Sequence, residues 1–207
     1  MKNAFVRNVI LALAPLTLGL MAAGCLSRPA LVQQDFMLQA PPLANPAPRP
    51  IGGVLTLASC EVSPPFAGRP LVYRIGPNAF ETDHYAGFLV PSDETLSIAI
   101  RNWLAQSGLF ASVTEPDSSA PAGQFLHVYV DELYGDLQTS GRPQAVLSLS
   151  IALVDAKKGQ FLFQKEYSRH LPVDQNTAVA IVAGWNKALG EIMGEFASDL
   201  KHLKKSR

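Results

Sequence analysis

Three long segments in the second half of the chain alternate apolar and polar residues with a period of two. They span residues 124–134, 145–155 and 160–170. Because successive side chains of a strand point to opposite faces of a sheet, this alternation predicts antiparallel strands with one face toward the core. Asp155 to Gly159 separates the last two segments, and Gly159 suits the positive φ of a hairpin loop. The residues expected to face the core are Leu126, Val128, Val130, Leu147, Leu149, Ile151, Leu153, Phe161, Phe163 and Tyr167.

Shorter apolar runs in the first half predict four further strands. Residues 53–62 and 71–75 are bounded by glycine and proline, which interrupt regular structure. A polar turn follows, then residues 84–90 are expected to form an edge strand and residues 109–114 a strand that returns from a helix. Because both faces of the first run carry apolar side chains, Cys60 is interpreted as a small buried hydrophobe rather than a reactive thiol.

Two segments have helical periodicity instead. The first follows Pro91, with Ser92 expected to cap the free amides and Ser107 and Gly108 expected to end the helix. Four apolar residues recur on one face of this helix, at the spacing of an amphipathic helix. They are Leu96, Ile100, Trp103 and Leu104.

The second helix occupies the C-terminal part of the chain and is expected to be capped by Asp174 or Asn176. Gly184, Gly190 and Gly194 lower its helix propensity, so packing must compensate. Its apolar stripe is expected to lie on the sheet, since nothing else in the chain is large enough to cover it. The stripe comprises Val182, Trp185, Ala188, Leu189, Ile192, Met193, Phe196, Leu200 and Leu203.

Together these elements predict an α+β fold. We expect a mixed, mainly antiparallel sheet with two helices packed on one face, which is a two-layer sandwich. The length suits one domain of ordinary size, predicted to span residues 53–207.

Residues 1–24 have the pattern of a secretory signal. Lys2 and Arg7 precede an apolar run that is too short to span a membrane well, and small residues then lead to Cys25. The ending Ala-Ala-Gly-Cys resembles the bacterial lipobox, with Ala22 where the lipobox usually has leucine. This resemblance implies lipidation of Cys25. The alternatives are an ordinary cleaved signal with a chance cysteine and an uncleaved anchor.

Residues 25–52 are predicted to be an acylated, proline-rich tether, because repeated prolines favour extended polyproline-like conformations. At about 3.1 Å per residue, some 25 residues would hold the domain on the order of 70 Å from its lipid. Roughly three acyl chains make a durable anchor, since each buried CH₂ contributes about 0.8 kcal/mol. Asp35 to Leu38 interrupts the tether with apolar side chains, and this piece is expected to pack on the domain.

Composition argues against several classes of function. Without residues 1–24 the chain has 15 basic and 17 acidic residues, and it has no basic stripe of the kind that binds nucleic acid. If Cys25 carries lipid, Cys60 has no partner for a disulfide within the chain. The sequence has no GxxxxGK[ST] phosphate loop, no G-x-S-x-G elbow and no metal-binding histidine spacing. We therefore expect no catalytic residue, no cofactor and no metal, and hence no enzyme.

Short motifs follow one another in a fixed order along the mature chain. They are Phe36-Met37-Leu38, Leu71-Val72-Tyr73-Arg74, Tyr85-x-x-Phe88 before Pro91, the Leu96 to Leu104 helix before Ser107-Gly108-Leu109-Phe110, the Asp155 to Gly159 hairpin, and Trp185-x-x-Ala188-Leu189. In this order and spacing they resemble the ABC-type transport auxiliary lipoproteins, the PqiC-like family. The resemblance covers most of the mature chain. Two positions depart from the family, which tends to carry tryptophan in place of Phe88 and tyrosine in place of Phe36.

The resemblance implies an accessory subunit of a transport system for lipid or hydrophobic solute. Its partners would be an MCE-domain substrate-binding protein, a permease and an ATPase, and homo-oligomerisation is left open. Leu26, in place of Asp, after the acylated cysteine resembles the sorting signal for the outer membrane, with the domain on the periplasmic face. Two alternatives remain: a lipoprotein that binds hydrophobic ligand between the sheet and the long helix, and a structural envelope lipoprotein unrelated to transport.

Tyr73, Arg74, Tyr85 and Phe88 are the candidate partner-binding residues. They cluster in the region of short strands, where polar and aromatic groups alternate, and aromatic residues and arginine commonly anchor protein interfaces. The alternative is that Tyr73 and Phe88 belong to the core and that Arg74 is a structural ion-pair partner.

Overall fold

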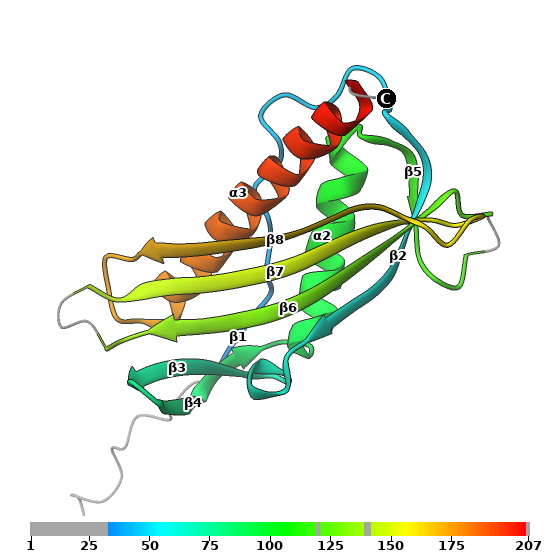
Figure 1. The fold of residues 1–207 in the computed structure, drawn as a ribbon. Helices are drawn as coiled ribbons and strands as arrows, with labels where there is room; N and C mark the ends of the chain where they lie inside the picture. The colour runs from blue at the N-terminus through cyan, green and yellow to red at the C-terminus, as the bar shows by residue number, and fades with distance from the viewer. Residues whose placement is uncertain (1–32, 119–120, 139–141, 206–207) are drawn as a thin grey trace, which may run out of the picture. The chain divides into compact units, whose positions relative to one another are not determined.

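A computed structural model describes residues 33–118, 121–138 and 142–205. They belong to one compact unit, Gln33–Arg207 (Figure 1). The predicted signal sequence and the predicted lipidation site, Cys25, lie outside the described residues. In the described ranges no helix is long and apolar enough to cross a membrane.

The described part of this unit is an eight-stranded sheet with two helices on one face, which confirms the predicted α+β, two-layer architecture (Figure 1). A short 3-10 helix, η2 (Pro64–Phe66), joins the second and third strands. The strands are β1 (Gln34–Phe36), β2 (Gly52–Val62), β3 (Pro70–Gly76), β4 (Ala79–Phe88), β5 (Phe110–Thr114), β6 (Gln124–Asp136), β7 (Gln144–Asp155) and β8 (Phe161–Pro172).

Strand β6 is paired along both of its edges. One edge runs antiparallel to β7, which in turn runs antiparallel to β8. The other edge is shared, because β2 lies parallel to its first part and β3 pairs with Gly135 and Asp136 at its end. The three long antiparallel strands are therefore confirmed, as is the hairpin at Gly159, whose φ is 64°. The parallel pairing of β2 with β5 and β6 was not predicted, since alternation reveals the buried face but not a neighbour's direction.

Helix α2 (Ser92–Ser107) packs on β2 and β5, and helix α3 (Ala178–Lys205) packs on β7 and β8. Both predicted apolar stripes face the sheet and are buried, except that Leu203 is half-buried. Gly108 ends α2 in the left-handed conformation, as predicted, with φ 67°. The largest fully buried side chains are Trp185, Phe88, Phe196, Leu38, Leu55, Leu71, Leu96, Ile100, Leu104, Leu109, Leu126 and Leu133.

The helix N-termini differ from the predicted caps. Ser92 does not cap α2, because its hydroxyl donates to the carbonyl oxygen of Phe66 (3.1 Å) and ties α2 to η2. At α3 the cap is Thr177 rather than Asp174 or Asn176, since the Thr177 hydroxyl accepts the amide of Ala180 (3.3 Å).

Two strand predictions also need correction. Strand β4 begins at Ala79, inside the predicted polar turn. It is not an edge strand along its whole length, because β1 pairs with its last three residues. Phe161, predicted to face the core, is 67% exposed. A register shift between β7 and β8 places Leu162 as an extra residue between Phe161 and Phe163, which reverses the alternation at that point.

Residues 37–51 form a strap across the two helices (Figure 1, blue to cyan). The amide of Leu38 donates to the Thr95 hydroxyl (2.9 Å), and the Leu38 side chain is buried. The indole N–H of Trp103 donates to the carbonyl oxygen of Pro41 (2.9 Å). These contacts confirm that the Asp35 to Leu38 segment packs on the domain, and they extend the packed region beyond it.

The strap also contacts α3 and the end of α2. The amide of Gln39 donates to the Asn186 side chain (2.8 Å), and the amide of Ala47 donates to the carbonyl oxygen of Ser107 (2.8 Å). Much of the segment predicted as a tether, residues 25–52, is therefore part of the compact unit, which begins at Gln33. The prolines do favour an extended chain, but this chain lies on the helices, where the Pro41 carbonyl oxygen accepts the indole N–H of Trp103.

Two glycines of α3 allow close approach of other segments. A Cβ at Gly184 would lie 2.5 Å from the Cβ of Ala145 in β7, and a Cβ at Gly190 would lie 2.8 Å from the Pro41 ring of the strap. Tight packing at these two positions thus compensates for their low helix propensity, as predicted.

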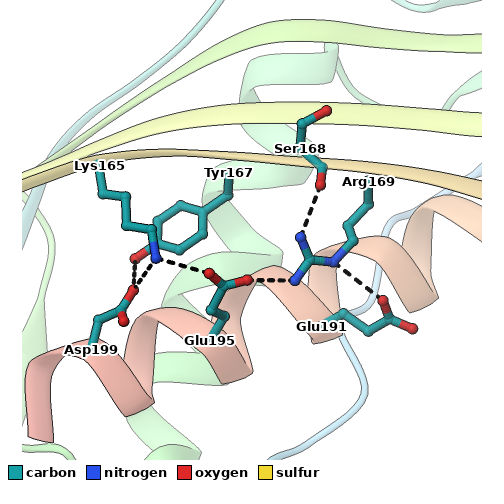
Figure 2. Close-up of polar contacts among 7 residues, drawn as sticks. All are labelled: Lys165, Tyr167, Ser168, Arg169, Glu191, Glu195 and Asp199. Atoms are coloured by element: carbon teal, nitrogen blue, oxygen red, sulfur yellow. Dashed lines mark hydrogen bonds and ion pairs between the residues drawn. The ribbon is translucent and has the colours of Figure 1, made fainter. Parts of the chain in front are cut away.

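A polar network joins β8 to α3 along one side of the sheet (Figure 2). The Lys165 ammonium lies 2.8 Å from both the Glu195 and the Asp199 carboxylates. The buried Tyr167 hydroxyl donates to Asp199 (2.8 Å). Desolvation, together with this carboxylate, raises the pKa of Tyr167.

Arg169 extends the same network toward the start of α3. Its guanidinium contacts Glu195 (2.5 Å) and Glu191 (3.3 Å), so Glu195 bridges Arg169 and Lys165 (Figure 2). The two cations lower the pKa of Glu195 through these bonds. The network fixes the position of α3 along β8, the last strand on that side of the sheet.

Candidate partner-binding surface

Two of the four predicted partner-binding residues lie inside the domain. Phe88 is only 1% exposed, and its ring centroid lies 5.9 Å from that of Trp185. The prediction that Phe88 contacts a partner is therefore wrong. Tyr73 is also buried, and its hydroxyl donates to Asp83 (2.9 Å); desolvation, together with this carboxylate, raises the pKa of Tyr73. The alternative interpretation, that both rings belong to the core, describes them correctly.

Arg74 is a structural ion-pair partner. Its guanidinium binds the buried carboxylate of Asp136 at the end of β6 and lies 5.0 Å from the centroid of the Tyr134 ring. The bond to Arg74 lowers the pKa of Asp136 and raises that of the arginine. Arg74 thus fastens β3 to β6 at the point where these strands pair. Its side chain keeps 27% exposure, so one side of it still reaches the surface.

Tyr85 is the one predicted residue of the four that is mainly exposed, at 53%. Its backbone is held in place by Asp83, whose carboxylate accepts the amides of Tyr85 (2.8 Å) and Ala86 (2.9 Å). The same carboxylate accepts the Tyr73 hydroxyl. Tyr85 therefore projects from a well-ordered backbone, and a ring presented in this way loses little entropy on binding.

An aromatic cluster that the sequence did not predict lies beside Arg74. Phe66 stacks on Tyr134 at 5.5 Å between centroids, and Phe80 meets both rings edge-on, at 6.0 Å and 5.5 Å. Phe80 remains 48% exposed. It lies opposite Arg74 in the β3–β4 hairpin, so a hairpin prediction at residues 77–78 would have placed the two side chains on one face. Periodicity misses this pairing because the turn is too polar to indicate the start of a strand.

Strand β4 has a free edge from Ala79 to Tyr85 within the part of the chain that the structure describes. Strand β3 pairs with one side of it, whereas β1 reaches only Ala86 to Phe88 on the other. A groove of about 580 Å³ is formed by this part of β4 together with residues of β3 and η2. It is lined by Pro65, Val72, Tyr73, Phe80, Glu81, Thr82, Asp83, His84 and Tyr85. The groove and the exposed rings of Phe80 and Tyr85 are called the hairpin edge below. It offers aromatic surface, unpaired backbone groups and negative charge.

The described residues contain little that points to other chemistry. Among them, no group of three or more histidine, cysteine or acidic side chains could hold a metal ion. Cys60 is half-buried, and desolvation, with smaller contributions from Asp93 and Glu61, raises its pKa to about 12. Its thiol is thus strongly disfavoured as a nucleophile at neutral pH. This agrees with its interpretation as a small hydrophobe rather than a reactive thiol, although the residue is only partly buried against the core.

Comparison with known proteins finds similar folds but no similar sequence. No family model matches the chain, and no curated protein does. The protein XCC0632 from Xanthomonas campestris, of the family model DUF330, matches with a TM-score of 0.65 at 18% identity, over 80% of this chain and 91% of that one. An uncharacterized protein of solved structure matches with a TM-score of 0.58 at 15% identity, over 82% and 99%. The likeness shows the fold alone.

Proposed function

We propose that the protein is a membrane-anchored lipoprotein of the cell envelope that serves as the accessory subunit of an ABC-type (MCE) transport system. It acts as an adaptor rather than a catalyst, and the system it serves moves lipid or hydrophobic solute. The lipobox-like ending at Cys25 and the ordered motifs of the PqiC-like resemblance support this proposal. The expected partners are the MCE-domain substrate-binding protein and, through it, the permease and ATPase.

The observation that carries the adaptor role is the hairpin edge. Phe80 and Tyr85 are large rings that remain about half exposed on a strand held firmly by Asp83. Exposed aromatic side chains on a rigid backbone are the groups that most often anchor a protein interface. Tyr73 supports this surface through the bond from its hydroxyl to Asp83, and Arg74 lies opposite Phe80 across the hairpin.

The compact unit would lie close to the membrane. Only residues 26–32 separate Cys25 from Gln33, where the unit begins. At about 3.3–3.6 Å per residue, this stretch spans at most roughly 30 Å even when fully extended. An adaptor on so short a connection would bind a partner whose end reaches the membrane, and not one that stays far from it.

A pull-down tests the hairpin edge. Wild-type protein, a Phe80→Ala, Tyr85→Ala double variant and Phe161→Ala are compared for capture of the MCE-domain protein. Phe161 is the matched control, because it is 67% exposed and lies outside the hairpin edge, in β8. We expect the double variant to lose at least about tenfold in affinity, since hot-spot rings each contribute more than about 1 kcal/mol. Equal capture by the double variant and the control would refute the surface.

The anchor is tested separately. A Cys25→Ala variant is expected to lack the acyl mass and to leave the membrane fraction. Unchanged mass and unchanged fractionation would refute the lipoprotein assignment while leaving the hairpin-edge test intact.

A further inference from the structure

A second pocket opens between the last turns of α3 and the adjoining end of the sheet. Its volume is about 140 Å³. The walls are mainly apolar and come from strands and helix together: Phe110, Leu153, Leu162, Leu200 and Leu203. A cavity of about 150 Å³ with such walls holds a benzene molecule, so this pocket has room for about six carbon atoms.

A cation completes the lining. Lys204 belongs to the pocket wall in the final turn of α3. None of the ion pairs within the described ranges of the chain involves it, whereas Lys165 and Arg169 on β8 are each paired with two carboxylates. The pocket thus combines an alkyl-sized apolar volume with a positive charge.

We infer that this pocket binds one alkyl chain of an anionic amphiphile. The chain lies among the leucines, and the negative group lies at Lys204. This goes beyond the proposed adaptor role, and its test needs neither the membrane nor a partner protein. The pocket and the hairpin edge share none of their lining residues, so failure of one leaves the other standing.

The test is a titration followed by the NMR signals of the leucine methyl groups. The protein is the mature chain from residue 25 with Cys25→Ala, which carries no acyl chain of its own. The probes are n-alkyl carboxylates of about four to twelve carbons. Each methylene that enters the pocket should strengthen binding about fourfold, and the gain should stop once about six carbons are enclosed. Saturable shifts are expected at Leu153, Leu162, Leu200 and Leu203.

Variants with matched controls locate the site. Leu203→Trp fills the pocket from a half-buried position and should weaken octanoate binding at least about tenfold, whereas Val179→Trp, at an exposed position of the same helix, should not. Lys204→Glu should weaken octanoate but not octanol, and Lys205→Glu, outside the lining, should weaken neither strongly. The Lys204 pair keeps the test decisive if the tryptophan variant fails to fold.

Absence of saturable shifts would overturn the inference, as would affinity that keeps rising up to the longest probe with shifts spread over the surface. Unchanged octanoate binding by both Leu203→Trp and Lys204→Glu would overturn it as well.

Discussion

Cys60 in β2 shows how burial changes the chemistry of one side chain. Its ordinary pKa of 9.0 rises to about 12, mainly because the thiolate would be desolvated. At pH 8 the thiolate fraction then falls from about one in ten to about one in ten thousand. In a Cys25→Ala background, Cys60 should react with a thiol reagent about a thousandfold more slowly in native protein than in urea. Equal rates would show that β2 opens freely.

The same shift predicts how stability depends on pH. Between about pH 9 and pH 12 the unfolded chain has lost the thiol proton while the folded protein retains it. The stabilisation from Cys60 is therefore complete below about pH 9 and is lost as the pH rises toward 12. Urea unfolding at about pH 8 and pH 10.5 should show a fall in the free energy of unfolding, and Cys60→Ala should reduce that fall.

Two glycines of α3 make a matched test of packing against helix propensity. Alanine at Gly194 meets nothing within 4 Å, so Gly194→Ala should stabilise the protein by about 1 kcal/mol. Alanine at Gly184 would collide with Ala145 and Val173, so Gly184→Ala should destabilise it by about 1–3 kcal/mol despite the same gain in propensity. Chemical denaturation measures both, and stabilisation by both variants would contradict the close approach of β7 to α3.

At the scale of elements, the network between β8 and α3 depends on Glu195, which bridges Lys165 and Arg169 (Figure 2). All three side chains are partly exposed, so Glu195→Gln should cost only about 0.2–1 kcal/mol, and added salt should reduce the loss. Glu191→Gln is the matched control, because among the described residues Glu191 forms an ion pair with Arg169 only, and it should cost less. Denaturation at low and high salt measures both effects.

The contribution of Glu195 to stability depends on pH with the opposite sign to that of Cys60. The pKa of Glu195 lies below its ordinary 4.5 in the folded protein, so its contribution is present above about pH 4.5 and is lost as the pH falls through the folded pKa. The wild type should therefore lose more stability than Glu195→Gln on acidification from about pH 6 to pH 3. Identical losses would mean that the network does not form in solution.

Periodicity predicted the elements because each one buries a single face. The alternation of residues 124–170 and the stripe of α3 mostly correspond to buried positions. Phe163 and Leu203 are half-buried, and Phe161 is exposed because one extra residue changes the register. Periodicity could not predict the hairpin edge equally well. Tyr85 was found from its residue type, whereas Phe80 lies in a polar stretch and gains its meaning only from pairing with Arg74 across the hairpin.

At the scale of the molecule, the strap was missed for a related reason. Residues 37–51 have no period of their own, and they are held by single bonds to side chains far away in sequence, such as Thr95, Trp103 and Asn186. Proline-rich composition indicates an extended chain, but it does not indicate whether that chain is free or lies on a surface. The contacts decide this, and they place the start of the compact unit at Gln33.

Two truncated chains test that boundary. A chain that begins at Gln33 keeps the strap, and it should unfold at the same denaturant concentration as the mature chain. A chain that begins at residue 53 loses the burial of Leu38, worth about 1.5–3 kcal/mol, and the strap's hydrogen bonds at about 0.5–1.5 kcal/mol each. The combined loss of about 4 kcal/mol or more approaches the whole stability of many domains.

The shorter chain should therefore unfold at much lower urea concentration, with broadened signals from Trp103, whose indole loses its acceptor on Pro41. A Trp103→Phe variant of the longer chain is the control, since it removes that one bond and leaves the rest of the strap in place. It should fall between the two truncated chains in stability. Equal stability of the chains that begin at Gln33 and at residue 53 would return residues 37–51 to the tether and lengthen the reach of the lipid anchor accordingly.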